Sequence, residues 1–411
     1  MIELKVDVDP AEVGFDGERL RRIDRHFDGY LERNQLPGYL AVVTRNGKVA
    51  HLASNGQRDI EAGLPVETDT IWRVFSMTKP VTSVAAMMLV EEGLIDLNDP
   101  ISRWLPEFSE PKVFIQGSFV RMTTEPATEP IRLWHLLTHT AGLTYGFHRS
   151  HPVDGIYREA GFDWGTAPGL DLAGVSEAIA KLPLLFQPGS EWNYSVATDI
   201  LGRLVEVVSG QSLDAFFAER IFTPLGMHET GFQADPGVLD RLAALYVPNP
   251  KTKAPLRHDE MGAIGRVTPS AFSGGGGLVS TAGDYHRFTQ MLVRGGELDG
   301  VRLLGPRTVR LMASNHLPGG VDLETYGRPT FAESPYHGFG FGLGFSVLED
   351  PVKAKTPASA GEFAWGGAAS TAFWVDPDEG ITVLFFTQLL PSTTYPIRVE
   401  LRHLVYQALI G

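Results

Sequence analysis

Apolar positions recur at helical spacing near the start of the chain. Between residues 17 and 35, Leu20, Ile23, Phe27 and Leu31 are separated by three or four positions and lie among charged residues. This spacing places them on one face of a helix. The pattern therefore predicts an amphipathic helix that packs this face against a core.

The apolar runs that follow are typical of strands. Residues 39–45 and 48–53 are separated only by Asn46-Gly47, and both positions of this pair favour the positive φ of a tight hairpin turn. Residues 71–75 form a further short strand-like run. A helix with Pro80 in its first turn is then predicted to run to about residue 92, because proline is tolerated at helix starts.

The middle of the chain reads as helical patches joined by long loops rich in proline and glycine. The predicted helices cover residues 131–140, 198–209, 212–221, 283–293 and 306–314. After about residue 338 the pattern returns to strands, with a second hairpin at residues 368–375 and 381–388 and a closing helix at 396–409.

Strand-rich ends therefore flank a helix-rich middle. The two sets of strands can belong to one domain only if the ends of the chain meet in a shared sheet. We expect an α/β domain from residues 1–95 and 325–411, an inserted, mostly helical domain from 96–324, and a functional cleft between them.

Composition narrows the function classes. The 411 residues include 35 Lys and Arg, 49 Asp and Glu and no cysteine, so the formal net charge is −14. Without cysteine the chain has no disulfide, thiol nucleophile or Cys-ligated metal. An acidic chain does not favour nucleic acid or an anionic membrane as its main partner, because both attract basic patches.

The start of the chain alternates apolar and charged residues and lacks the basic start and apolar block of a secretory signal. The most apolar early stretch, residues 81–90, is shorter than the roughly 20 residues that a bilayer span needs. We therefore expect a cytoplasmic protein.

Several hydrolase and nucleotide-binding signatures are absent from the sequence. No serine lies in a Gly-x-Ser-x-Gly pattern, and His-Glu-x-x-His and the glycine-rich nucleotide loops do not occur. Among the remaining motifs, Ser76-Met77-Thr78-Lys79 can carry chemistry. A lysine one helical turn from a serine can take its proton, and a helix start adjacent to the serine offers N–H groups to an oxyanion.

The spacing alone has low specificity, since Ser109-Glu110-Pro111-Lys112 matches it equally well. Pro106 and Pro111 make a helix improbable at the second copy, which we expect to be a surface loop. Ser76 instead follows a predicted strand and precedes a long apolar helix, so its context favours catalysis. The alternative interpretation of Ser76 is a helix cap.

Phe75-Ser76-Met77-Thr78-Lys79-Pro80, with the upstream Thr68-Asp69-Thr70-Ile71-Trp72-Arg73, is followed along the chain by four further segments. They are Leu133-Trp134-His135-Leu136-Leu137-Thr138-His139-Thr140-Ala141-Gly142-Leu143, Pro188-Gly189-Ser190-Glu191-Trp192-Asn193-Tyr194-Ser195, Gly274-Gly275-Gly276-Gly277-Leu278-Val279-Ser280-Thr281 and Trp365-Gly366-Gly367-Ala368. In this order the segments resemble the class C β-lactamase and penicillin-binding superfamily, and within it most closely the family VIII carboxylesterases. The resemblance spans roughly residues 20 to 405. It implies a β-lactamase-like fold with an antiparallel sheet flanked by helices.

The resemblance also implies roles for three side chains. Ser76 would be the acylated nucleophile, Lys79 would assist its deprotonation, and Tyr194 would shuttle protons between nucleophile, leaving group and water. Either Lys79 or Tyr194 could be the acylation base. Without the resemblance, a buried tyrosine bonded to backbone is the simpler interpretation of Tyr194.

The third motif departs from the lactamase pattern. Trp365-Gly366-Gly367 replaces Lys-Thr-Gly, and Val196 replaces an asparagine. The glycines let a substrate approach the strand closely, so the N–H groups of Ser76 and Ala368 are the candidate oxyanion hole.

Both departures favour neutral esters over penicillins. We expect Trp365, Gly366, Gly367, Tyr145 and Phe75 to contact the substrate, with core packing as the alternative for Trp365. Phe147 could also line an acyl pocket.

His135 and His139 lie four residues apart, a spacing that can hold a metal. No third ligand stands nearby in the sequence, so structural histidines are favoured over a zinc hydrolase, and no metal or cofactor is expected. We expect the four glycines at 274–277 to form a tight loop beside the cleft rather than a phosphate cradle.

The sequence therefore predicts a serine esterase for small-molecule, short-chain esters that forms an acyl-enzyme on Ser76. The alternatives at the same site are a β-lactamase or D-amino-acid peptidase and an acyltransferase. A non-catalytic binding protein that retains only the fold is the alternative from another class. The pattern does not predict an oligomeric state.

Overall fold

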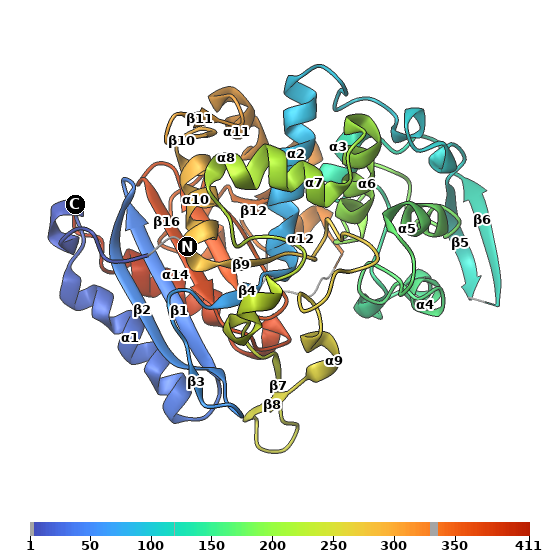
Figure 1. Ribbon diagram of the computed structural model, residues 1–411. Coiled ribbons are helices and arrows are strands. Elements are labelled where there is room, and N and C mark those ends of the chain that lie inside the picture. Colours follow the sequence, from blue (N-terminus) through green and yellow to red (C-terminus); the bar gives the residue numbers. More distant parts are fainter. Residues whose placement is uncertain (1–3, 119, 329–335) are drawn as a thin grey trace.

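A computed structural model describes residues 4–118, 120–328 and 336–411, so the first three residues of the alternating start lie outside it. One eight-stranded sheet dominates the fold (Figure 1). Its order is β12-β13-β14-β15-β16-β1-β2-β3, and neighbouring strands are antiparallel. In that order the strands are Phe339–Phe341, Ser346–Leu348, Phe363–Gly366, Ala372–Asp376, Ile381–Phe386, Gly38–Arg45, Lys48–Asp59 and Leu64–Pro65.

The two ends of the chain meet at the centre of this sheet. Strand β1 pairs with β16, with Leu40 opposite Phe386 and Arg45 opposite Ile381. Apolar residues on both faces of these strands explain the pairing, because each face is covered and neither can be left in water. The predicted antiparallel sheet, built from both chain ends and flanked by helices, is confirmed.

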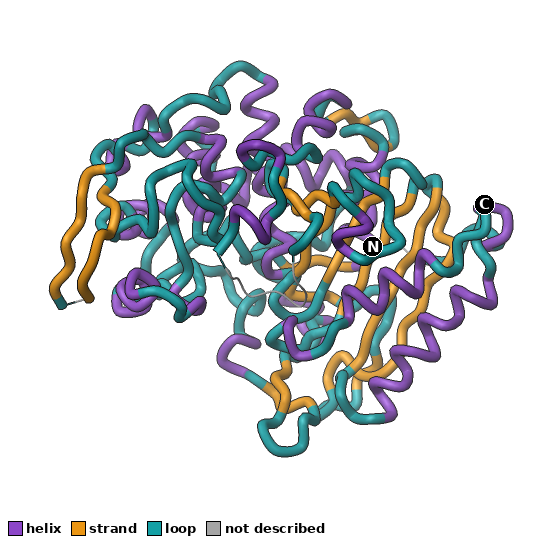
Figure 2. The backbone as a smooth tube through the Cα atoms, turned by 180° about the vertical axis from the view of Figure 1, so that it is seen from behind, coloured by secondary structure: helices purple, strands orange, loops and turns teal. Residues whose placement is uncertain are grey.

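Helices cover the two faces of the sheet in different ways. On one face, α1 (Gly17–Glu32) and α14 (Ile397–Tyr406) pack Phe27 and Leu401 against Val43 and Phe385. Figure 2 shows this helix pair from behind, near the chain ends. On the other face, the side chains that alternate with these join the larger core of the molecule.

The turn between β1 and β2 follows the expected chemistry. Asn46 and Gly47 have φ values of 51° and 77°, so both turn residues lie in the left-handed region. This is the backbone that a two-residue turn requires if it is to match the twist of its strands. The predicted hairpin is confirmed.

Helix α2 is the central element of the larger core. It spans Thr78–Glu91, is buried on almost every side and contacts α6. A helix that is apolar all round is expected in the interior of a large domain. The other helices of the middle of the chain are α3 (Leu133–Leu137), α4 (Pro152–Glu159), α5 (Leu172–Ile179), α6 (Ala197–Ser209), α7 (Leu213–Phe217), α8 (Thr223–Leu225), α9 (Asp259–Gly262), α10 (Ala282–Val293), α11 (Pro306–Met312) and α12 (Leu323–Tyr326).

Several predicted elements differ in extent, among them the run expected at 71–75, which is a strand only over Ile71–Arg73. The helix expected at 131–140 covers only Leu133–Leu137, and His139 has a φ of 56°, which ends the helical path. The helix at 212–221 changes at residue 218 into a π-helical turn. The strand expected from Ala368 starts at Ala372, and Ala368 itself lies in the preceding turn.

A hairpin in the middle of the chain is not predicted by the pattern. Strands β5 (Lys112–Ser118) and β6 (Arg121–Pro126) pair with each other and stand out from the body of the molecule (Figure 1). Their side chains are mostly exposed, so they carry no apolar alternation that would signal a strand. The second Ser-x-x-Lys copy ends at Lys112, the first residue of β5, and is not helical, as predicted.

The remaining strands form short two-stranded sheets. They are β4 (Ile71–Arg73) with β9 (Val279–Thr281), β7 (Tyr246–Pro248) with β8 (Pro255–Arg257), and β10 (Glu297–Leu298) with β11 (Val301–Arg302). A short α13 (Pro351–Ala354) lies between β13 and β14. Within the described ranges, the chain contains no helix of the length and apolarity needed to cross a bilayer.

Candidate active site

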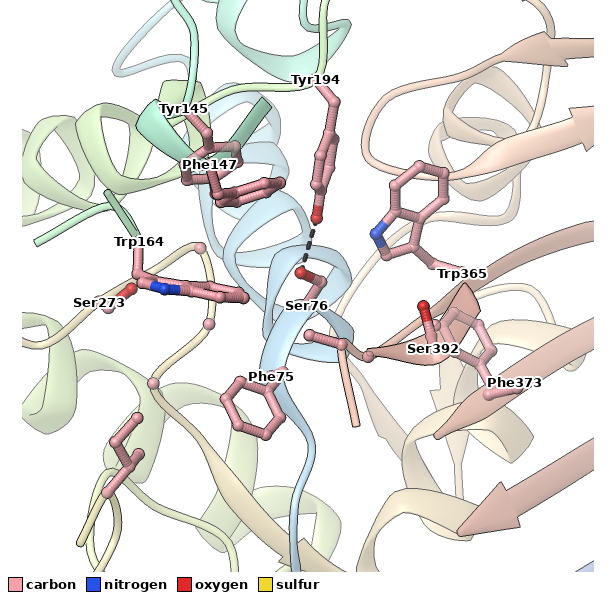
Figure 3. A pocket seen from close by; sticks show the side chains of 18 of the residues that line it. Phe75, Ser76, Tyr145, Phe147, Trp164, Tyr194, Ser273, Trp365, Phe373 and Ser392 are labelled. Carbon is pink, nitrogen blue, oxygen red and sulfur yellow. Dashed lines mark hydrogen bonds between the residues drawn. The ribbon is translucent and has the colours of Figure 1, made fainter. Parts of the chain in front are cut away.

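A cavity of about 460 Å³ opens beside Ser76, between strand β14 and the helical part of the molecule. Figure 3 shows Ser76 in its centre, with Tyr194 directed at it, Trp365 on one side and Trp164 on the other. All the residues predicted to contact substrate line this one cavity. They are Phe75, Tyr145, Trp365, Gly366 and Gly367, together with Ala368.

Ser76 is presented by a strained turn. It lies in a 3₁₀ turn, Phe75–Met77, that leads into α2, and Phe75 before it has a φ of 43°. A bulky residue in the left-handed region is unfavourable and persists only where its surroundings hold it. The Phe75 side chain packs against Leu245 and Leu390, which holds this conformation and places the serine hydroxyl at the cavity wall.

Lys79 lies one turn further along and is 2% exposed. Its Nζ atom has three oxygen partners, at 3.3 Å from Ser76 Oγ, 3.0 Å from Tyr145 Oη and 2.7 Å from the Gly275 carbonyl. An ammonium group has three N–H donors, so these three oxygens satisfy it. The predicted proximity of the serine and the lysine is present in the structure.

Tyr194 reaches the same serine from a distant part of the chain. Its hydroxyl donates a 2.6 Å hydrogen bond to Ser76 Oγ, and the Lys79 ammonium lies 4.5 Å from the centre of its ring. The loop before α6 carries Tyr194, and His148 Nε2 lies 2.7 Å from the Tyr194 carbonyl oxygen. Ser76, Lys79 and Tyr194 therefore form one connected group.

Tyr145 lines the cavity, but its hydroxyl faces Lys79 rather than open space. Burial, followed by the nearby Asp199 carboxylate, raises the pKa of Tyr145 well above its ordinary value. It is therefore a neutral phenol that accepts a hydrogen bond from the lysine. Tyr145 therefore holds Lys79 in place, in addition to its predicted contact with the substrate.

Asp199 is a component of the site that the sequence analysis does not single out. This carboxylate is fully buried on α6, and its Oδ1 accepts hydrogen bonds from Ser273 Oγ at 2.6 Å and the Gly275 N–H at 3.1 Å. Burial raises the pKa of Asp199, and the Lys79 charge opposes that rise. Gly275 thus bridges the two charged groups, because its N–H binds Asp199 and its carbonyl binds Lys79.

The glycine run at 274–277 forms the tight loop expected beside the cleft. A Cβ atom on Gly275 would lie 2.5 Å from Asp199 Oδ2, and one on Gly274 would lie 2.7 Å from the Thr198 carbonyl oxygen. Side chains at these positions would push the loop away from α6. The glycines therefore permit close backbone approach, a common reason for their use.

The third motif lies at the end of β14. Trp365 packs its ring 5.4 Å from that of Tyr194, and Gly366 is the last residue of the strand. Ala368 follows in a turn at the cavity wall. Within the described parts of the chain, no acceptor pairs with the Ala368 N–H, so this donor is available at the wall. Val196, in place of the family's asparagine, is buried in the core.

Loops supply an aromatic wall of the cavity, which includes Phe147, as expected, and residues that the sequence does not single out. Phe147 stacks on Tyr145, and Trp164 lies 4.9 Å from Phe147, so an aromatic wall leads from the lysine towards solvent. Trp164 is 45% exposed and Val267, which also lines the cavity, is 65% exposed. Trp164 and Val267 stand singly in loops without periodicity, so no pattern in the sequence indicates them.

His135 and His139 make separate structural contacts. His135 Nδ1 accepts from the Arg132 N–H at 3.1 Å, and His139 Nδ1 lies 3.2 Å from Ser195 Oγ. Burial lowers the pKa of His135 to about 4 and that of His139 well below its usual range. Among residues 4–118, 120–328 and 336–411, no group of three potential ligands is placed to hold a metal.

Comparisons with known proteins show which family and which fold this chain shares. The family model described as Beta-lactamase matches residues 23–407. Esterase EstB from Burkholderia gladioli is 34% identical over 97% of this chain and 98% of its own length.

Two solved structures share the fold. EstCE1, described as a hydrolase with promiscuous acyltransferase activity, is 29% identical and has a TM-score of 0.78 over 95% of this chain and 98% of its own. Simvastatin Synthase (LovD) from Aspergillus terreus is 25% identical with a TM-score of 0.81 over 96% and 100%.

Proposed function

The chain belongs to the Beta-lactamase family, and from this membership we propose that it is a serine hydrolase that cleaves short-chain carboxylic esters through an acyl-enzyme on Ser76. One observation carries the proposal. A serine hydroxyl at the wall of an apolar cavity is hydrogen-bonded to both a buried lysine and a tyrosine phenol. The esterase EstB relative, which matches nearly the whole chain, supports the same reaction class.

The proposed reaction has two halves. In the first, Lys79 as the neutral amine or Tyr194 as the phenolate takes the Ser76 proton, and Ser76 Oγ bonds to the ester carbonyl carbon. The bond to the alcohol oxygen then breaks as that oxygen receives a proton from the same pair. In the second, water loses a proton to the same groups and attacks the acyl carbon. The bond to Ser76 Oγ breaks, Oγ takes the proton back from these groups, and the acid leaves. Each half passes through an oxyanion, and we assign its binding to the N–H groups of Ser76 and Ala368. Water is the only co-reactant, so no cofactor is needed.

The character of the cavity favours a neutral ester. The motif position that is a lysine in lactamases is Trp365, and its ring packs against Tyr194 and Phe341. Arg398 lies beside this strand, but its Nη2 donates to the backbone carbonyls of Gly367 and Thr371. A substrate carboxylate would therefore meet an aromatic ring and a guanidinium group already engaged with the backbone.

Covalent labelling provides the direct test. Intact mass spectrometry after incubation with a fluorophosphonate should show one adduct on the wild-type chain and none on Ser76→Ala. The same pair should differ in turnover of p-nitrophenyl butyrate by several orders of magnitude. Wild-type turnover by Ser76→Ala would refute the mechanism. The absence of any adduct on the wild-type chain would instead favour a binding protein that retains only the fold.

The ester preference is tested separately with nitrocefin. We expect hydrolysis of this β-lactam to be far slower than ester hydrolysis. Trp365 stands where the third motif of lactamases has a lysine, and Val196 stands where their second motif has an asparagine. Comparable rates would reverse the preference and assign the site to β-lactams.

A second candidate reaction is transfer of the acyl group to an alcohol instead of water. The observation that favours it is the extent of the cavity, which continues from Ser76 along Phe147 and Trp164 to an exposed apolar rim. An apolar alcohol bound there would compete with water for the acyl-enzyme. Adding butanol to the p-nitrophenyl butyrate reaction should then yield butyl butyrate while the rate of p-nitrophenol release is maintained or increased. Release of butyric acid alone would exclude transfer to this alcohol.

A further inference from the structure

Hydrogen bonds fix the turn at residues 367–371, which carries Ala368. Its first and last residues are bonded to each other, since the Gly367 N–H donates to the Thr371 carbonyl at 2.9 Å. In the middle, Ser370 has a φ of 67°, and its hydroxyl donates to the Leu389 carbonyl at 2.8 Å. The Ala368 N–H is therefore displayed by a rigid turn rather than by a regular strand.

Arg398 holds both ends of this turn. It is the second residue of α14, and its Nη2 donates to the Gly367 carbonyl at 2.8 Å and to the Thr371 carbonyl at 3.0 Å. The guanidinium also lies against Gly366, where a Cβ atom would overlap its Cζ. A cation in the first turn of a helix opposes the helix dipole. Arg398 is thus unfavourable for the stability of α14 at this position, so its presence there needs an explanation other than helix stability.

The Gly367 carbonyl and the Ala368 N–H belong to the same peptide group. A positively charged donor on the oxygen of a peptide draws electron density away from its nitrogen and strengthens the N–H as a donor. We propose that Arg398 is a positioning residue of the oxyanion hole, which both fixes the Ala368 peptide and polarises its N–H towards the substrate. The inference rests on the proposed function, since it concerns the oxyanion of that reaction.

The two glycines of the third motif fit this arrangement for separate reasons. Gly366 leaves the space that the guanidinium occupies. At Gly367, a side chain would instead overlap the Val74 carbonyl and Thr371 Oγ1. The Gly-Gly pair therefore allows Arg398 to reach the peptide and the turn to lie against the segment that carries Ser76.

The competing explanation is that Arg398 only ties α14 to the turn that carries Ala368. A second arginine contact to α14 provides a control for this explanation. Helix α14 is held to the sheet by Ile397, Leu401 and Val405, which are fully buried. At its other end, Arg22 Nη1 donates to Gln407 Oε1 at 2.9 Å. Arg398→Met removes the guanidinium contact beside the turn that carries Ala368. Arg22→Met, at an exposed position, removes a guanidinium contact at the other end of α14, far from that turn.

The experiment compares oxygen and sulfur esters. Acylation rates of wild type, Arg398→Met, Arg398→Lys and Arg22→Met are measured with p-nitrophenyl butyrate and with its thionoester, in which sulfur replaces the carbonyl oxygen. Loss of an oxyanion donor costs about 100-fold or more in rate, so weakening one should cost roughly tenfold. We expect this loss in Arg398→Met for the oxygen ester, a smaller loss for the thionoester, and substrate affinity within about threefold of wild type.

The outcomes decide between the two roles. Partial recovery in Arg398→Lys, a restored cation, and a wild-type oxygen-to-sulfur ratio in Arg22→Met support the inference. Equal losses for both esters in Arg398→Met, or no loss at all, overturn it. Should Arg398→Met fail to fold, Arg398→Gln, which also removes the charge, decides by the same ratio.

Fluorophosphonate labelling of wild-type Ser76 distinguishes a failure of this inference from a failure of the proposed function. If Ser76 is labelled and the Arg398 variants keep the wild-type ratio, the inference alone is wrong. If Ser76 is not labelled in the wild-type chain, the proposed function itself fails.

Discussion

At the scale of single residues, the site places one hydroxyl between two groups that can exchange protons with it. Ser76 Oγ has Tyr194 at 2.6 Å and Lys79 at 3.3 Å. The shorter contact comes from a phenol at the cavity wall, whereas the lysine lies behind it with its other donors directed at backbone and Tyr145. In the proposed reaction, Tyr194 is therefore the group that would pass a proton to the leaving alcohol or take one from the incoming water.

Replacing this phenol is the sharpest test of a single residue. Tyr194→Phe keeps the ring against Trp365 and removes only the hydroxyl. We expect kcat/KM for p-nitrophenyl butyrate to fall about 10²- to 10⁴-fold, the usual contribution of a positioned acid–base group. The thermal midpoint should change little. Tyr39→Phe removes a phenol from the opposite side of the sheet and is the matched control. A Tyr194→Phe variant with wild-type turnover would remove the phenol from the mechanism.

The same residues show what the sequence could predict at this scale. The Ser76 and Lys79 pair follows from local spacing, because residues three apart on a helix share a face. Tyr194 lies 118 positions from Ser76. Only the ordered family motifs indicate that it joins the pair. Asp199 and Arg398 have neither a local spacing nor a motif, so their positions follow only from the fold.

At the scale of elements, the glycine loop at 274–277 shows how backbone shape supports the site. Gly275 lies between Asp199 and Lys79 and passes close to the buried carboxylate. Gly276 faces Phe75 instead, and a Cβ atom there would have its nearest contact at 3.8 Å. Two adjacent glycines thus make different demands on the loop.

This difference gives a paired prediction. In Gly275→Ala, the Cβ atom would lie 2.5 Å from Asp199 Oδ2, so either the loop or α6 must move. We expect a loss of about 1–3 kcal/mol in unfolding free energy, the typical cost of overpacking, together with reduced turnover as the carbonyl leaves Lys79. The unfolding free energy of Gly276→Ala should lie within about 0.5 kcal/mol of the wild-type value, as is usual for a substitution that causes no clash. Urea denaturation of both variants measures the difference, and equal stability would contradict this account of the loop.

The elements themselves were predictable to different degrees. The Asn46-Gly47 hairpin and α10 follow directly from turn chemistry and apolar spacing. The hairpin of β5 and β6 does not, because its exposed strands lack an apolar face. The helix expected over residues 131–140 is shorter than predicted, since His139 takes a left-handed φ that apolar spacing cannot reveal.

At the scale of the whole molecule, the strand-rich ends flanking a helix-rich middle predict one sheet made from both ends. The pairing of β1 with β16 confirms it. The eight-strand order could not be derived in the same way, because which strands become neighbours depends on non-local contacts. The fold also buries several histidines as neutral groups, which makes its stability depend on pH.

For His135, burial, assisted by the neighbouring Arg132 charge, lowers the pKa to about 4. An unfolded chain protonates the same imidazole near its ordinary value of about 6.5. Between these two values the unfolded state binds a proton that the folded state does not. The free energy of unfolding therefore decreases as the pH falls through this window, by about 1.4 kcal/mol per pH unit for this group. The buried carboxyls of Asp199 and Glu362, whose pKa values are raised by burial, act in the opposite direction.

A single substitution isolates the histidine from these opposing carboxyls. His135→Asn can retain an acceptor for the Arg132 N–H, now held 3.1 Å from His135 Nδ1, but it cannot titrate. The variant should be less stable than wild type at pH 7.5, because it packs less well, and the gap should narrow as the pH is lowered from 6.5 to 4.5. Urea unfolding at four pH values in this range measures the gap, with the exposed His403→Asn as the control substitution on α14. A gap that stays constant with pH would mean that His135 takes up its proton in the folded state as readily as in the unfolded chain.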